Sequence, residues 1–176
     1  MERPPGFTLP ELMFSMAIVA GLVGWGVPAF RDLERNAART SEVNLFLQAI
    51  YLARSEAIKR NGVVSLCASL DGANCAAGNT AWDRGWIVFV NNDRDSPAER
   101  DAGEDLLHAY PTWVGGYVLA NRDTLSFRAF GQSGVTATFT FCDDRGSRQA
   151  RAVIISQSGR PRVSDRSASG TALSCA

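Results

Sequence analysis

The sequence Gly6-Phe7-Thr8-Leu9-Pro10-Glu11-Leu12, with the apolar run that follows it to Phe30, decides how the chain is organised. Between Phe7 and Phe30 the only ionisable residue is Glu11. A helix needs about 20 mainly apolar residues to span the hydrocarbon core of a bilayer, so this run is long enough. A carboxylate inside a membrane segment costs on the order of 2.5–3.5 kcal/mol even on insertion scales, so it usually has a partner. The run is therefore predicted to be a membrane helix whose acid has a specific role.

Three interpretations of this segment compete. A secretory signal peptide has a shorter apolar stretch and a small-residue cleavage site after it, and carries no acid near its start. A simple signal anchor explains the length but not Glu11. The third interpretation is that residues 6–12 resemble the processing site of type IV pilins and pseudopilins. This resemblance implies that a prepilin peptidase cleaves after Gly6 and methylates the new N-terminal residue, Phe7. It also implies that Glu11 pairs with the α-amino group of a neighbouring subunit during assembly.

Helical periodicity continues beyond the apolar run. Apolar residues recur at three- and four-residue steps and predict a core-facing stripe: Val43, Phe46, Leu47, Ile50, Ala53 and Ala57. Charged residues fall mostly on the other faces: Arg35, Arg39, Glu42, Glu56 and Lys59. Pro28 is predicted to end or kink the membrane segment, and Asn61-Gly62 is a plausible helix stop. We expect one N-terminal helix with an amphipathic half over residues 31–60.

After Gly62 the pattern becomes typical of short strands. They are expected at residues 63–69, 85–90, 106–110, 117–119, 125–130, 135–141 and 152–156. In the segment 135–141, Val135, Ala137, Phe139 and Phe141 should share one face, with threonines on the other. One long helix laid against an antiparallel β-sheet is an α+β fold.

Several segments are similar to minor pilins of the FimT/GspH class: residues 52–60, 64–67, 85–89, 142–146, 152–156 and 159–162. The resemblance implies the type IV pilin fold, with a leader peptide at 1–6, a transmembrane and assembly helix at 7–30 and a periplasmic domain at 31–176. It also implies a single-pass protein of the inner membrane that is assembled into a pilus or pseudopilus. Its partners would be prepilin peptidase and other pilins or pseudopilins.

Four cysteines follow the membrane segment, and an even number in an exported domain favours disulfides, with three possible connectivities. We favour Cys67–Cys75, which closes a short turn, and Cys142–Cys175, which ties down the C-terminal tail. The chain has no Cys-x-x-Cys pair and only one histidine, which disfavours a zinc site. We expect no metal and no cofactor.

The C-terminal residues 143–176 carry six basic and three acidic residues and include Gly159-Arg160-Pro161-Arg162. Glycine allows a turn with positive φ, and in extended chain residues 160 and 162 point to the same face. Two guanidinium groups held on one face suit phosphate oxygens. In the FimT branch of the family, the resemblance implies that this motif binds DNA for natural transformation. Other arginines are candidates to extend the patch: Arg145, Arg148, Arg151 and Arg166. The alternative is a solvated arginine pair that contacts Asp143, Asp144 or Asp165.

Other candidate sites are weaker. The acidic segment 91–105 has oxygen ligands that suit calcium, but Ser96 and Ala102 stand where an EF-hand loop needs glycine and glutamate. A solvated acidic turn is the preferred interpretation. His108 has no relay partner placed by the sequence. Trp82, Trp86 and Trp113 would suit base stacking, but are expected in the core. The chain contains no nucleophile motif, phosphate loop or paired-acid signature, so we expect that the protein is not an enzyme.

Three functions remain possible for this sequence. The first is a minor type IV pilin that binds DNA without sequence preference through its C-terminal arginines. The second is a GspH-like minor pseudopilin of a type II secretion system, which acts in pseudopilus assembly and protein secretion. The third is a priming subunit of the filament that binds no external ligand.

Overall fold

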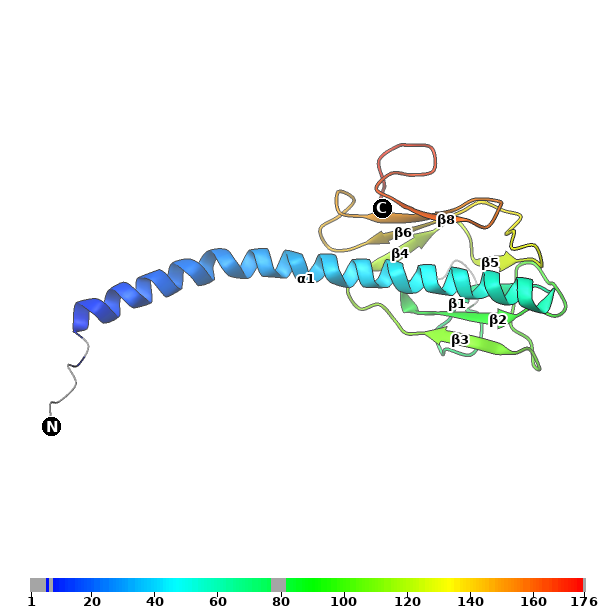
Figure 1. Ribbon diagram of the computed structural model, residues 1–176, viewed down its shortest axis with the longest axis horizontal. Coiled ribbons are helices and arrows are strands. Elements are labelled where there is room, and N and C mark those ends of the chain that lie inside the picture. Colours follow the sequence, from blue (N-terminus) through cyan, green and yellow to red (C-terminus); the bar gives the residue numbers. More distant parts are fainter. Residues whose placement is uncertain (1–5, 7, 77–81, 176) are drawn as a thin grey trace. The chain divides into compact units, whose positions relative to one another are not determined.

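The computed structural model describes residues 6, 8–76 and 82–175, and within these it contains one long helix and eight strands (Figure 1). The helix α1 covers Leu9–Arg60, and a short 3₁₀ helix, η1, covers Trp82–Arg84. The strands are β1 (Val64–Ala68), β2 (Trp86–Val90), β3 (Leu106–Tyr110), β4 (Tyr117–Ala120), β5 (Thr124–Phe127), β6 (Ala137–Cys142), β7 (Arg151–Ile155) and β8 (Pro161–Ser164).

Helix α1 continues through Pro28, so of the two predicted effects of this proline, an end to the helix or a kink, the first does not occur. Proline removes one intrahelical hydrogen bond and crowds the carbonyl of the residue four positions earlier. That residue is Gly24, and the loss stays local because the helix is 52 residues long. The predicted stop is confirmed, since Asn61 has φ 50° and its N donates to Ile58 O at 3.2 Å. Gly62 N donates to Ala57 O at 3.1 Å, which completes a Schellman motif.

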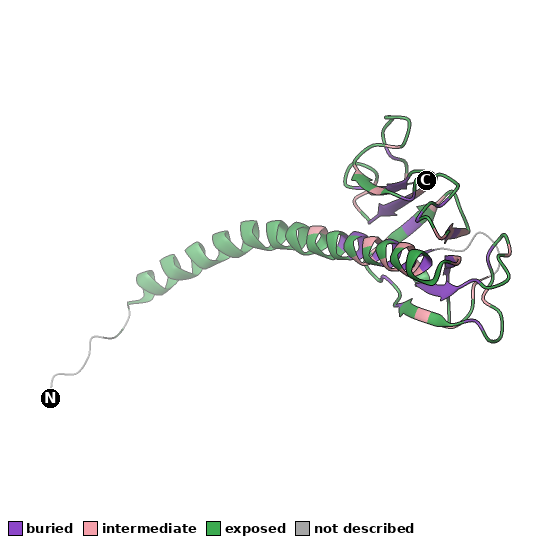
Figure 2. Ribbon diagram, turned by 45° about the vertical axis from the view of Figure 1, so that its right-hand side comes forward, coloured by how far each residue is buried: buried purple, intermediate pink, exposed green. Residues whose placement is uncertain are grey.

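Packing divides the chain into two compact units, Met1–Ala37 and Ala38–Ala176. In the described part of the first unit the large apolar side chains of α1 are exposed, among them Phe14 and Trp25. Figure 2 shows this part of the helix in the colour of exposed residues. This end of the helix is long and apolar enough to cross a membrane by length and composition. A membrane role for residues 7–30 stays a prediction.

The second unit contains two four-stranded antiparallel sheets, with strand orders β3-β2-β1-β5 and β4-β6-β7-β8. The C-terminal part of α1 packs against both sheets through one hydrophobic core. Phe46 lies at its centre: its ring is 5.3 Å from that of Trp86 on one sheet and 4.5 Å from that of Phe139 on the other. The predicted α+β architecture is confirmed.

The predicted stripe on α1 packs into this core, with two differences. Leu47 is only half-buried, whereas Ala49 is fully buried. Arg39 and Glu42 were expected to fall on other faces, but both are buried, at 4% and 8% exposure. Residues separated by three or four positions share one helix face. Their positions on the core-facing side of the helix therefore bury these two residues although they are charged. The buried Arg39 donates a hydrogen bond to Asp143, 104 residues further along the chain.

The strand predictions hold with shifts at the ends, and one strand was missed. Strand β5 ends at Phe127 rather than at residue 130, because Arg128–Gly131 form a turn in which Gly131 has φ 70° and its N donates to Arg128 O at 2.7 Å. Strand β6 begins at Ala137 rather than Val135. Strand β8 was expected only as a turn with extended chain, and its opening proline suits the first residue of an edge strand.

Two disulfides join Cys67 to Cys75 and Cys142 to Cys175, the pairing that the sequence favoured. The second closes 33 residues and holds the C-terminal segment against β6 and β7, where Leu173 packs with Ala152 and Ile154. Thr140 shares this face of the sheet, opposite the face of Phe139 and Phe141 as predicted, and is 8% exposed.

Candidate functional site

The Gly159-Arg160-Pro161-Arg162 motif forms the hairpin between β7 and β8. Gly159 N donates to Ser156 O at 2.8 Å, and Ser156 N donates to Arg160 O at 3.2 Å. Gly159 has φ 75°, and a Cβ there would lie 2.2 Å from Gly131 O. The glycine is required twice, for its backbone conformation and for the close approach of the neighbouring turn. Its role is to build the hairpin that presents the arginines.

The strand register defines where the two arginines point. Arg162 lies opposite Ile154 in the β7–β8 ladder, so both side chains are on the same face of the sheet. Ile154 packs with the C-terminal segment and not with the α1 core, so this is the outer face. Arg160 alternates to the same face, and both arginines are exposed. Among the residues that the structure describes, neither has an acidic partner.

Arg145 forms an ion pair within the domain. Its Nη2 lies 2.7 Å from Asp143 Oδ2, and Arg39 Nη1 approaches the same oxygen at 3.3 Å. The side chains of Asp143 and Arg39 are 2% and 4% exposed. The hydrogen bond from Arg145 lowers the pKa of Asp143, while burial lowers the pKa of Arg39 despite the opposing charge of Asp143. The structure places Arg145 in an ion cluster that joins α1 to the β6–β7 turn.

The remaining tail arginines lie in the β6–β7 turn, at the start of β7 and beyond the end of β8. Arg148 is exposed in the β6–β7 turn, and Arg151 is half-buried with its Nη1 donating to Ala150 O at 2.9 Å. Arg166 is exposed, and its Nη1 donates to Gly170 O at 3.1 Å. Six residues of extended chain span about 20 Å, so Arg166 and Arg160 lie at opposite ends of β8. The predicted arginines therefore lie at both ends of β8 and do not form one compact cluster.

Sequence reasoning missed a second basic region beside the hairpin. Ser133 Oγ donates to Ser156 O at 3.0 Å and Gly134 N donates to Gln157 O at 3.2 Å, so the β5–β6 loop is fastened to the hairpin. This loop lines a groove to which Arg94, Arg122 and Arg128 contribute. These arginines are distant from one another and from the C-terminal motif in sequence, so no local pattern joins them.

The tryptophans occupy the core, as expected, and are not available for base stacking. Trp82, Trp86 and Trp113 are 1%, 0% and 7% exposed. His108 is exposed, and its ring meets that of Tyr110 edge-on at 4.4 Å.

The acidic segment 91–105 is organised by its own backbone. The Glu104 carboxylate accepts hydrogen bonds from Asn92 N at 2.6 Å and from Asp101 N at 3.1 Å. Within the described part of the chain, no three acidic, histidine or cysteine side chains gather in an arrangement that holds a metal ion.

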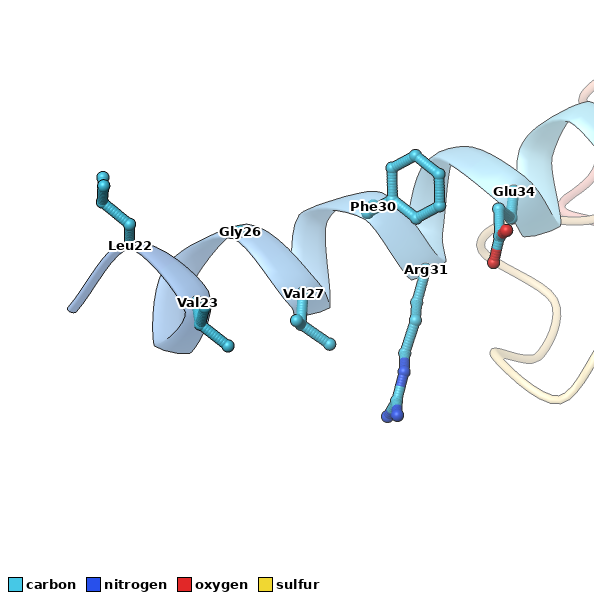
Figure 3. Close-up of a pocket in the computed structure, with 7 residues that line it drawn as sticks. All are labelled: Leu22, Val23, Gly26, Val27, Phe30, Arg31 and Glu34. Carbon is cyan, nitrogen blue, oxygen red and sulfur yellow. The ribbon is translucent and has the colours of Figure 1, made fainter. Parts of the chain in front are cut away.

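The N-terminal site is only partly described. Glu11 is exposed in the first turn of α1, and its backbone carbonyl accepts a hydrogen bond from Ser15 Oγ at 2.8 Å. Gly6 lies outside regular structure, and Phe7, the predicted methylation position, lies outside the described residues. Further along this unit, Gly26 leaves a shallow hollow on α1 between the side chains of Leu22 and Phe30 (Figure 3).

Comparisons with known proteins agree with this architecture. Residues 42–159 match the protein family described as type II transport protein GspH. Two crystal structures of the type IV minor pilin FimU from Pseudomonas aeruginosa strain PAO1 share the fold, with TM-scores of 0.54 and 0.55. They are 23% and 22% identical to this chain, and the alignments cover 80% and 84% of it and 98% and 99% of FimU. No curated protein matches the chain in sequence.

Proposed function

Because the chain belongs to the GspH family of minor pilins and pseudopilins, we propose that it is a minor type IV pilin that holds DNA through Arg160 and Arg162. The observation that carries this proposal is the hairpin geometry. Both guanidinium groups extend from the outer face of an edge strand and are exposed, and neither has an acidic partner among the described residues. Guanidinium groups in a fixed geometry bind phosphate oxygens, which every DNA sequence presents. The binding is therefore independent of sequence.

The proposal includes deployment from the inner membrane. Prepilin peptidase cleaves after Gly6 and methylates Phe7, and Glu11 then pairs with the N-terminal amino group of a neighbouring subunit. The apolar end of α1 and the two disulfides support an anchored protein whose domain lies in the oxidising periplasm. The variant Gly6→Val should remain in the membrane and stay out of filaments, as read by immunoblotting of sheared pili. A mutant that assembles normally contradicts this route.

The DNA proposal is tested by titrating the protein with labelled duplex DNA at two salt concentrations. The variant with Arg160→Ala and Arg162→Ala should bind more weakly at low salt. Its plot of log K against log salt should flatten by about 1.8, since each phosphate contact contributes about 0.9. Arg84→Ala, which removes an exposed arginine from η1, is the matched control and should bind as the wild type does. Unchanged, salt-insensitive binding in the double variant rejects the proposal.

The second candidate is a minor pseudopilin of a type II secretion system, which the description of the matching family favours. In that role the protein contacts other pseudopilins or an exported protein and needs no DNA. Genes for secretion components beside this gene, rather than genes for other minor pilins, would support it. A purely structural priming subunit is distinguished by the double arginine variant, because the DNA-binding proposal expects normal piliation with lost DNA uptake. We assign no catalytic role.

A further inference from the structure

We propose that the groove beside the β7–β8 hairpin extends the arginine site and holds a short single-stranded segment of nucleic acid, with Phe130 stacking on a base. This inference rests on the proposed function, because the same filament subunit is taken to hold DNA through Arg160 and Arg162. It adds a second contact surface and a preference for unpaired strands.

The groove is large and its walls come from four parts of the second unit. It has a volume of about 850 Å³, within the range of roughly 300–1,000 Å³ found for small-molecule sites. The walls are the turn 61–63 between α1 and β1, the loop 94–97, the β4–β5 turn with Arg122, and the β5–β6 loop with Arg128 and Phe130. A groove of this size fits one or two nucleotides rather than a duplex.

The wall that carries Phe130 is held in place by hydrogen bonds and close packing. Arg128 N donates to Gln132 O at 2.9 Å, and Gly131 N donates to Arg128 O at 2.7 Å. Gly131 lies so close to α1 that a Cβ on it would be 2.8 Å from Arg54 Nε. Phe130 nevertheless remains 86% exposed at the tip of this turn. An aromatic ring held in solvent by a fixed backbone is preformed for stacking, which lowers the ordering cost of binding.

The β5–β6 loop that lines the groove also contacts the hairpin that presents Arg160. Ser133, in the groove wall, donates through Oγ to Ser156 O at 3.0 Å, and the carbonyl of Gly131 lies against Gly159. Residues of the groove wall and of the arginine hairpin therefore share a direct contact. A strand bound at Arg160 can continue into the groove without leaving the protein surface.

The charges of the groove suit phosphate. Arg94, Arg122 and Arg128 are exposed, and none has an acidic partner among the residues that the structure describes. Two acids also line the groove. Asp95 already accepts hydrogen bonds from Asn91 Nδ2 and from Glu99 N, both at 2.8 Å. Asp123 is exposed, so three positive charges face two negative ones.

The pairing of arginines with one exposed aromatic ring favours a single strand. In a duplex the base faces are stacked on each other, so Phe130 has nothing to contact except backbone. An unpaired base presents its π-face, and proteins that bind single strands combine a basic groove with aromatic stacking platforms. Arginine also adds cation–π contact to bases. A duplex would contact Arg160 and Arg162 but would leave the groove empty.

The test compares single-stranded and duplex oligonucleotides of equal length by fluorescence anisotropy, with the full chain in a nonionic detergent. Phe130→Ala should weaken single-strand binding about tenfold, since stacking on one aromatic side chain is worth roughly 1–3 kcal/mol, or fivefold to more than a hundredfold. Duplex binding should change less than twofold. Phe130→Tyr keeps the ring and should restore single-strand affinity. Val114→Ala, at a side chain that is 94% exposed outside the groove, is the control.

The outcomes separate this inference from the proposed function. If the double variant of Arg160 and Arg162 loses duplex binding while Phe130→Ala leaves single-strand binding unchanged, the groove inference is wrong and the proposed function stands. If Phe130→Ala weakens both substrates equally, a stacking role is also excluded. If the wild type binds neither substrate, both proposals fail. Selective loss of single-strand binding, restored by tyrosine, supports the inference.

Discussion

Glu42 offers the sharpest test of how α1 packs in the second unit. Its side chain lies on the buried face of the helix, and the residue is 8% exposed. Its Oε1 is buried with no hydrogen-bond partner in the described part of the structure. Burial raises the pKa of this carboxyl from 4.5 to about 7, because the charged form is poorly solvated there. The folded protein therefore holds a proton at pH values where the unfolded chain has released it.

The sign and size of the effect follow from linkage between protonation and folding. Between pH 4.5 and about 7 the folded state binds more protons than the unfolded state, so stability falls as pH rises through this range. The difference between 4.5 and about 7 is 2.5 pH units. At about 1.36 kcal/mol per unit this corresponds to at most about 3 kcal/mol. The loss is complete above the folded pKa.

The assay is urea unfolding of a fragment from residue 31 to the C-terminus, followed by tryptophan fluorescence at pH 5 and pH 8. Wild type should lose up to about 3 kcal/mol of unfolding free energy between these values. The Glu42→Gln side chain stays neutral at both pH values, so the drop in unfolding free energy from pH 5 to pH 8 should be smaller than in the wild type by the contribution of Glu42. The variant should therefore be more stable than the wild type at pH 8. Glu34→Gln makes the same change at an exposed position of α1 and should follow the wild type.

Subtracting the two pH profiles isolates the contribution of Glu42 from all other titrating groups. A difference profile that is flat between pH 5 and pH 8 would refute the reasoning, because the carboxyl would then be solvated in the folded protein. A Glu42→Gln variant that is less stable than wild type at pH 8 would refute it as well, since it would show that the charged form has a stabilising partner.

Three other perturbations probe the framework around the arginine hairpin. Gly159→Ala should destabilise the domain in urea unfolding and weaken DNA binding in anisotropy measurements although both arginines remain, because residue 159 has φ 75° and its new Cβ would lie 2.2 Å from the carbonyl oxygen of Gly131. Full DNA affinity in this variant would contradict the prediction. Replacing Cys142 and Cys175 by serine should cost about 4 kcal/mol, from the entropy of a 33-residue loop, as read by thermal unfolding against the oxidised wild type. Arg39→Ala should lower the free energy of unfolding by about 3–5 kcal/mol, since it breaks a buried ion pair with Asp143. A change under 1 kcal/mol in urea unfolding would show that Arg145 alone neutralises Asp143.

Much of the fold follows from local patterns in the chain. The apolar run with a single acid, the stripe from Val43 to Ala57 and the Asn61-Gly62 stop predict α1 because each depends on residues close in sequence. The alternation in β6 and the apolar runs of β1, β2 and β7 predict strands for the same reason. Strand β8 was missed because a four-residue edge strand that opens with proline has no apolar pattern, and only its register with β7 defines it.

The candidate site divides in the same way. The sequence by itself determined that Arg160 and Arg162 share a face, since alternation in extended chain is a property of the backbone. Only the tertiary structure decided that Arg145 joins Arg39 and Asp143, because Arg39 and Asp143 are 104 residues apart in sequence. It also decided that Glu42 is buried, since burial depends on what packs against the helix. It also decided that Gly159 is needed for contact with Gly131, and that Phe130 and three dispersed arginines meet in one groove. The direction of side chains along a strand depends on neighbouring residues, whereas the burial of a residue and the meeting of distant side chains depend on how distant segments pack.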